Sequence, residues 1–170
     1  MAKPGAGWPV MGSLIFFVLA PGTVAGLVPW LLSGNERSPF LRWPGVRVVG
    51  AFLVTGGAVV LAESFARFAL EGRGTPAPVA PTERLVVSGL YRFVRNPMYV
   101  AVLSAILGQA LLFGSTRVLW YAAAVALAFH LFVTLYEEPT LRGRYGAEYE
   151  AYRRAVGRWW PRLSPWRGGR

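Results

Sequence analysis

The chain has 170 residues, 54% of them hydrophobic, and a formal net charge of +10, which suits a single domain. Its positive charge is almost all arginine, since Lys3 is the only lysine, and aspartate is absent. Such a chain fits anionic lipid headgroups better than nucleic acid, which requires an exposed basic face on a soluble fold. The lack of cysteine excludes disulfides, and a single histidine, His130, argues against a metal site.

Long uncharged runs predict an all-α integral membrane bundle of about four transmembrane helices. The first expected span covers about 10–32, and we interpret it as a retained helix because it is longer than the apolar core of a signal peptide. The second, about 46–68, carries Glu63 and Arg67 near its end. These two residues lie four apart on one helical face, so we expect them to pair.

The third and fourth spans are expected over about 97–115 and 118–137. No charged residue lies in the 21 residues between Arg95 and Arg117 or in the 19 residues between Arg117 and Glu137. A helix needs about 20 residues to cross the hydrocarbon core. The connection between these spans is so short that they must run antiparallel.

The segments outside the spans are polar. Loop 71–95 is irregular and rich in proline and glycine. The basic tail, 140–170, holds eight arginines, which predicts a cytoplasmic C-terminus and a multi-pass protein with its site on the cytoplasmic side. Apolar residues at helical spacing in this tail predict an amphipathic helix lying at the membrane interface, namely Tyr145, Tyr149, Tyr152 and Val156.

The start of the third span predicts an anion site. Asn96 is suited to the N-cap and Pro97 to the first helical position. The first amides of the helix lack intrahelical partners and carry partial positive charge. Arg92 and Arg95 add full positive charge beside them, so we expect anions to bind here.

The end of the fourth span carries the opposite charge. Pro139 predicts that the helix stops or kinks at Glu138. Glu137 and Glu138 would then lie at the negative end of the helix dipole, which is unfavourable. A bound cation would relieve this, and so would an ion pair with Arg142 or Arg144; both interpretations stay open.

Because the two spans are antiparallel, their oppositely charged ends emerge together. This arrangement suits a zwitterionic ligand, with its carboxylate at the third span and its ammonium at the fourth, but simple salt bridging explains it equally well. Inside the second span, Thr55-Gly56-Gly57 permits close approach of another helix or of a flat ligand. Helix packing is the commoner reason for such a stretch.

Four sequence features in a fixed order resemble a known superfamily. They are GRGTPAP, RLVVSGLYRFVRNPMY, an apolar hairpin and LYEEPTLRGRYGAEYEAYRRAVGRWWPR, and the resemblance, over about residues 50–163, is to the isoprenylcysteine carboxyl methyltransferase and phospholipid methyltransferase superfamily. It implies an integral membrane enzyme that uses S-adenosyl-L-methionine, held at the ends of a helical hairpin.

The resemblance also implies site residues. Arg95, Pro97 and Tyr99 match the superfamily's Arg-His-Pro-x-Tyr motif, with Asn96 in place of the usual histidine. Asparagine holds no proton near neutral pH, so an acid/base role at this position is in doubt, and asparagine here is closer to the phospholipid branch. The cofactor ligands implied are Thr55, Gly56, Gly57, Arg95, Asn96, Pro97, Tyr99, Glu137 and Glu138.

Methyl transfer from a sulfonium chiefly demands alignment of the reactants. A carboxylate acceptor needs no base, whereas a protonated amine must first lose a proton. We therefore expect Glu138 to accept that proton and Arg95 to orient the cofactor or acceptor. Arg73, Tyr91 and Arg92 are expected to hold the head of a membrane lipid or lipidated acceptor.

The acceptor stays open among a prenylated cysteine carboxylate, a phospholipid amine and a small thiol. Two other functions also stay open. One is a sterol-type membrane reductase using NADPH, and the other is a non-enzymatic subunit that binds anionic lipid through its arginine tail.

Overall fold

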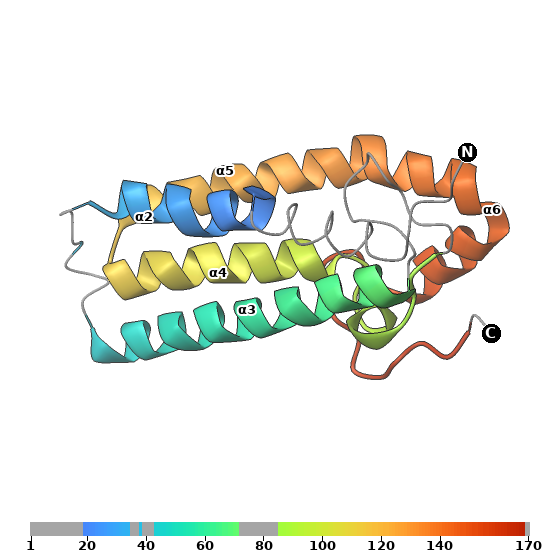
Figure 1. Cartoon of the computed structure of the whole chain (residues 1–170), viewed down its shortest axis with the longest axis horizontal. Helices are drawn as coiled ribbons and strands as arrows, with labels where there is room; N and C mark the ends of the chain where they lie inside the picture. The colour runs from blue at the N-terminus through green and yellow to red at the C-terminus, as the bar shows by residue number, and fades with distance from the viewer. Residues whose placement is uncertain (1–18, 35–37, 39–42, 72–84, 169–170) are drawn as a thin grey trace, which may run out of the picture.

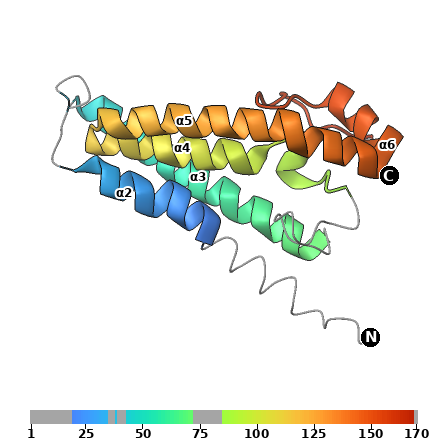
Figure 2. The ribbon, with the colours of Figure 1, turned by 90° about the horizontal axis from the view of Figure 1, so that it is seen from above.

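The computed structural model describes residues 19–34, 38, 43–71 and 85–168. The described part is helical and contains no strand, which confirms the all-α prediction. The helices lie lengthwise beside one another, and α4 contacts α2, α3 and α5 (Figures 1 and 2). The elements are η1 (Thr23–Leu27), α2 (Val28–Ser33), α3 (Pro44–Glu71), η3 (Gly89–Arg92), α4 (Pro97–Phe113), α5 (Thr116–Phe132), η4 (Val133–Glu137) and α6 (Glu138–Ala155).

Two helices of the described part are long and apolar enough to cross a membrane, Pro44–Arg67 and the continuous helix Thr116–Ala155. Two more apolar helices, Leu19–Ser33 and Pro97–Phe113, are shorter. Four helices thus occur where four spans were predicted, and two of them have the full length within the described residues. The first residues of the predicted 10–32 span and most of loop 71–95 lie outside the described residues.

Helices α3 and α4 pack with their backbones in close approach. A Cβ atom added to Gly57 would lie 2.7 Å from the carbonyl oxygen of Ala101. A Cβ added to Gly108 would lie 2.6 Å from the carbonyl oxygen of Gly50. Any side chain would force the helices apart, so glycine at these positions allows the close contact.

The turn between α4 and α5 makes these helices antiparallel. Gly114 ends α4 in the left-handed conformation, with φ 67°, which glycine adopts without strain. Ser115 caps α5 by accepting a hydrogen bond from the Val118 amide at 3.4 Å. The start of α4 and the end of α5 therefore lie at the same end of the bundle, as predicted (Figure 1).

Of the two outcomes predicted at Glu138, a helix end or a kink, the end does not occur, because the helix continues through Pro139 into α6. Proline lacks an amide hydrogen and its ring crowds the preceding turn. The helix widens into the π-helical turn η4 just before it, where the Glu138 amide donates to the Val133 carbonyl. Such local widening lets a helix pass an interruption. Glu137 and Glu138 therefore lie within a helix and not at its negative end.

Helix α6 reverses direction at Gly146, whose φ is 51° and ψ −123°. This is the conformation of the first central residue of a type II′ turn, which glycine dominates. The returning half buries Tyr149 and Tyr152, 2% and 3% exposed, against Val87 and Trp166, among others. The amphipathic pattern predicted a helix at the membrane interface, but the protein itself covers this apolar face.

The segment after α6 runs back to the loop that precedes α4. Three backbone hydrogen bonds join the two segments: Arg95 N–H to Gly157 O at 2.9 Å, Arg162 N–H to Phe93 O at 3.0 Å and Trp166 N–H to Arg92 O at 2.9 Å. We call residues 157–166 the C-terminal strap. It forms one side of the region where α4 begins and α5 ends.

Candidate functional site

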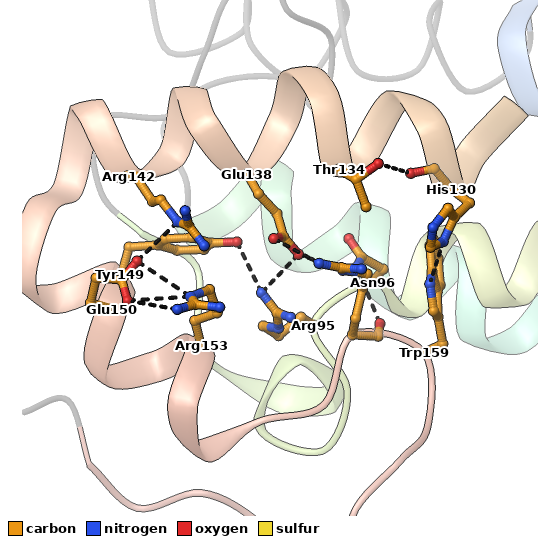
Figure 3. Close-up of polar contacts among 11 residues, drawn as sticks. Arg95, Asn96, His130, Thr134, Glu138, Arg142, Tyr149, Glu150, Arg153 and Trp159 are labelled. Carbon is orange, nitrogen blue, oxygen red and sulfur yellow. Dashed lines mark hydrogen bonds and ion pairs between the residues drawn. The ribbon is translucent and has the colours of Figure 1, made fainter.

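The two charged helix ends meet in one ion-pair cluster. Glu138, only 4% exposed, forms an ion pair with Arg95, with 3.0 Å between its Oε1 and Arg95 Nη1. Arg158 contacts both oxygens of the same carboxylate, Nε to Oε1 at 2.6 Å and Nη2 to Oε2 at 2.9 Å. Figure 3 shows Arg95 and Glu138 pointing toward each other from the loop and the helix. The ion-pair interpretation is thus realised, with Arg95 and Arg158 in place of the expected Arg142 or Arg144.

The Glu138 carboxylate also stabilises the charged form of its partner. Its hydrogen bond raises the pKa of the Arg158 guanidinium above the ordinary value. Arg142 instead pairs with Glu150, with 2.9 Å between Nε and Oε1. Both oxygens of Glu138 are thus engaged by arginines; burial raises the pKa of this carboxyl, but its contacts with Arg158 and Arg95 outweigh burial and lower the pKa below the ordinary value.

Glu137 lies in a different environment. Its Oε2 accepts a hydrogen bond from the Tyr99 hydroxyl at 2.8 Å, and no arginine pairs with it in the part of the chain that the structure describes. The Tyr99 ring lies 4.7 Å from that of Phe129 and 6.4 Å from that of Trp159, between centroids. A carboxylate beside aromatic rings is suited to an organic cation, through charge and cation–π attraction.

Asn96 precedes α4, as predicted, but its side chain does not cap the helix. Its Nδ2 donates to the Arg158 carbonyl at 3.1 Å, across to the strap. Asn96 thus occupies the predicted N-cap position without a capping hydrogen bond from its side chain. Because the amide of Asn96 points to the strap, its side chain does not occupy the amides at the start of α4, and Pro97 at the first position is buried.

Arg95 has an unused donor. Its side chain is 9% exposed and its Nη1 also donates to the Tyr149 hydroxyl at 3.1 Å. Its Nε is buried without a hydrogen-bond partner among the described residues. An unmet donor on a buried charged group is costly, so an anion accepting a hydrogen bond here would be stabilised.

Of the residues expected to hold the acceptor, Tyr91 lies near enough to Glu137 and Tyr99 for them to act on its phenol, and Arg92 bonds to the strap. Tyr91 is 6% exposed and its carbonyl accepts from Tyr152 at 2.6 Å; burial raises the pKa of its phenol well above the ordinary value. Arg92 donates through Nε to the Trp166 carbonyl at 2.8 Å. Arg73 lies outside the described residues.

The small-residue stretch of α3 divides between two faces. Gly57 faces α4, as described above, whereas a Cβ on Gly56 would meet nothing within 4 Å. Thr55 donates to the Ala51 carbonyl of its own helix at 2.9 Å.

Glu63 and Arg67, near the end of α3, form the predicted ion pair, with 2.8 Å between Glu63 Oε1 and Arg67 Nε. The main chain of Gly89 packs against this pair.

Sequence reasoning missed Arg158, Tyr149 and Trp159 as site residues. Trp159 donates to Nδ1 of His130 at 3.3 Å (Figure 3). The available signal was chemical: Glu138 needed a cationic partner, and the tail is rich in arginine. Nothing in the residue spacing distinguishes Arg158 from the other arginines of that tail.

Comparison with protein-family models matched residues 46–148 to the phospholipid methyltransferase family. No curated protein and no solved structure matched the chain. The matched region runs from α3 into α6 and holds both signatures that the structure brings together, Arg95 to Tyr99 and Glu137-Glu138. The apolar helices are in keeping with the membrane location of such enzymes. The chain therefore belongs to the phospholipid methyltransferase family, whose members are membrane methyltransferases.

Proposed function

We propose that this protein is an S-adenosyl-L-methionine-dependent methyltransferase that acts on a lipidic or small hydrophobic acceptor in the membrane. The observation that carries the proposal is the Tyr99–Glu137 hydrogen bond of 2.8 Å. It joins the two sequence signatures at one end of the α4–α5 hairpin, within the region that matches the family.

The chemistry of the side chains present fits this cofactor. S-adenosyl-L-methionine carries a carboxylate, an ammonium and a sulfonium, and it supplies a methyl group on positively charged sulfur. Glu137, which has no arginine partner among the described residues, offers negative charge beside the Tyr99, Phe129 and Trp159 rings. Arg95 offers a buried, unused donor to a carboxylate.

In this proposal Glu137 takes the role that sequence reasoning gave to Glu138. The Glu138 carboxylate is held by Arg95 and Arg158, so it positions Arg95 but is not available as a base. Glu137 contacts only the Tyr99 hydroxyl among the described hydrogen bonds. If the acceptor is an amine, Glu137 receives its proton, directly or through Tyr99.

The candidate acceptors remain a phospholipid amine, a prenylated cysteine carboxylate and a small thiol. Family membership favours the phospholipid.

The arginine-rich tail favours a site on the cytoplasmic side of the membrane. Protease protection in sealed, oriented vesicles tests this location. Cleavage of the tail by protease added on the non-cytoplasmic side would contradict it.

The function is tested by titrating the detergent-purified protein with S-adenosyl-L-methionine in a calorimeter and by following a labelled methyl group into lipid and peptide fractions. We expect saturable binding at one site and label in the lipid fraction. Glu148→Gln changes an exposed carboxylate outside the site. It is the control for glutamate-to-glutamine variants in the site and should bind S-adenosyl-L-methionine as the unchanged protein does. Absence of binding to S-adenosyl-L-methionine, with binding to NADPH, would favour the reductase; no binding to either would favour a non-enzymatic subunit.

A further inference from the structure

Arg158 lies ten residues beyond the region that matches the family, 46–148, yet it is the main partner of Glu138. Its Nε and Nη2 contact the two carboxylate oxygens at 2.6 Å and 2.9 Å. Two parallel bonds between a guanidinium and a carboxylate form the strongest and most directional of such pairs. Arg95 makes a single contact with the same carboxylate, at 3.0 Å.

The backbone holds Arg158 in place from two sides. Its carbonyl accepts the Asn96 side-chain amide at 3.1 Å, and the preceding carbonyl, of Gly157, accepts the Arg95 amide at 2.9 Å. Arg158 is therefore fixed relative to the start of α4 by its main chain and relative to Glu138 by its side chain.

The charges of this cluster do not cancel. Arg95 and Arg158 are two cations on one carboxylate, so one positive charge is in excess. The excess falls on Arg95, because Arg158 already satisfies both oxygens of Glu138. Its side chain is 9% exposed and its Nε has no hydrogen-bond partner in the described part of the chain.

We propose that Arg158 is a positioning residue of the methyl-donor site: by holding Glu138, it keeps Arg95 available to bind the carboxylate of the donor. The inference rests on the proposed function. Without Arg158, Glu138 would draw Arg95 into a two-bond pair, and the excess charge would vanish. Neutralising both Arg158 and Glu138 would restore one unpaired cation, Arg95.

The experiment measures ligand affinity by calorimetry in Arg158→Gln and in the double variant Arg158→Gln/Glu138→Gln. The first probe is S-adenosylhomocysteine, which has the carboxylate but no methyl group to transfer. We expect Arg158→Gln to weaken its binding roughly tenfold, as for directly coupled residues, and the double variant to recover to within about threefold of the unchanged protein. The second probe, decarboxylated S-adenosylmethionine, lacks the carboxylate and should bind all of these proteins alike.

Arg154→Gln, at an exposed arginine outside the cluster, is the matched control and should leave both affinities unchanged. Melting temperatures identify any variant that fails to fold, and Arg158→Lys, which keeps the charge but not the paired contacts, should bind S-adenosylhomocysteine with intermediate affinity. The proposal is overturned if Arg158→Gln binds S-adenosylhomocysteine like the unchanged protein, or if the double variant binds it more weakly than Arg158→Gln does. It is also overturned if Arg158→Gln weakens the binding of decarboxylated S-adenosylmethionine as much as that of S-adenosylhomocysteine. Failure of the unchanged protein to bind either probe would instead refute the proposed function, and this inference with it.

Discussion

Adjacent residues on a helix point about 100° apart, so two neighbouring carboxylates meet different surroundings. Glu138 points to the strap and the loop before α4, where Arg158 and Arg95 hold it. Glu137 points to Tyr99 on α4. One glutamate is therefore held by two arginines and the other by a tyrosine hydroxyl, a division that follows from helix geometry and not from the residue type.

The two glutamates should respond differently to the same substitution. Glu137→Gln removes the charge that faces the ligand, so we expect donor affinity to fall roughly tenfold or more while the melting temperature stays nearly unchanged. Glu138→Gln leaves the Arg95 side chain, 9% exposed, and the half-buried Arg158 side chain without a counter-charge, which costs about 3 kcal/mol and lowers the melting temperature by roughly 10 °C. Calorimetric titration and thermal unfolding in one detergent measure both quantities; a large loss of stability in Glu137→Gln with donor affinity intact would reverse the assignment.

At the scale of single elements, the sequence predicted some features well and others poorly. The start of α4 at Pro97 and the short turn at Gly114 that ends this helix carry strong local signals, and both were located correctly. Pro139 also gave a strong local signal, for a helix end, but the wide turn η4 lets the helix continue. Tertiary contacts of Glu138 with two arginines favour that continuation, and no local pattern contains them.

The contact between α3 and α4 distinguishes two neighbouring glycines. A Cβ on Gly57 would press on the α4 backbone, whereas one on Gly56 would meet nothing within 4 Å. We expect Gly57→Ala to cost about 1–3 kcal/mol because the helices must separate. Gly56→Ala should be neutral or stabilising, since alanine favours a helix over glycine by about 1 kcal/mol.

Melting temperatures of the two alanine variants, compared with that of the unchanged protein, test this assignment. Equal stabilities would contradict the close contact. Donor affinity, measured alongside, tests the interpretation that the resemblance gave to Thr55-Gly56-Gly57. A loss of affinity in Gly56→Ala at unchanged stability would assign this stretch to the ligand.

At the scale of the whole molecule, the tail folds back and forms one side of the candidate site. Sequence periodicity correctly indicated that Tyr149, Tyr152 and Val156 share a face, and it could not show what covers them. The structure covers them with protein, because α6 turns back and the strap bonds to the loop before α4. Arg95 and Gly157, which form a backbone hydrogen bond, lie some 60 residues apart in the sequence. Contacts over such a separation produce no periodic pattern in a single sequence. The position of Arg158 beside Glu138 could therefore not be predicted from the sequence.

The turn-back depends on one backbone conformation, that of Gly146. Its φ of 51° and ψ of −123° are strained for any residue with a side chain, at a cost of about 1–3 kcal/mol. Gly143, three residues earlier, has no positive φ, and a Cβ on either glycine would meet nothing within 4 Å. The two positions therefore differ in backbone conformation and not in available space.

We expect Gly146→Ala to loosen the strap and Gly143→Ala to leave it in place. Loosening removes Arg158 from Glu138 and the Gly157 carbonyl from the Arg95 amide. The measurement is hydrogen exchange at the Arg95 and Arg162 amides, which should quicken roughly tenfold for each 1.4 kcal/mol of local destabilisation, together with trypsin cleavage after Arg158. If both variants exchange at the same rate, Gly146 does not control docking of the strap. If Gly146→Ala exchanges these amides faster and also binds S-adenosylhomocysteine more weakly, docking of the folded-back tail supports donor binding. This is the result expected if Arg158 must pair with Glu138 to leave Arg95 available to the donor.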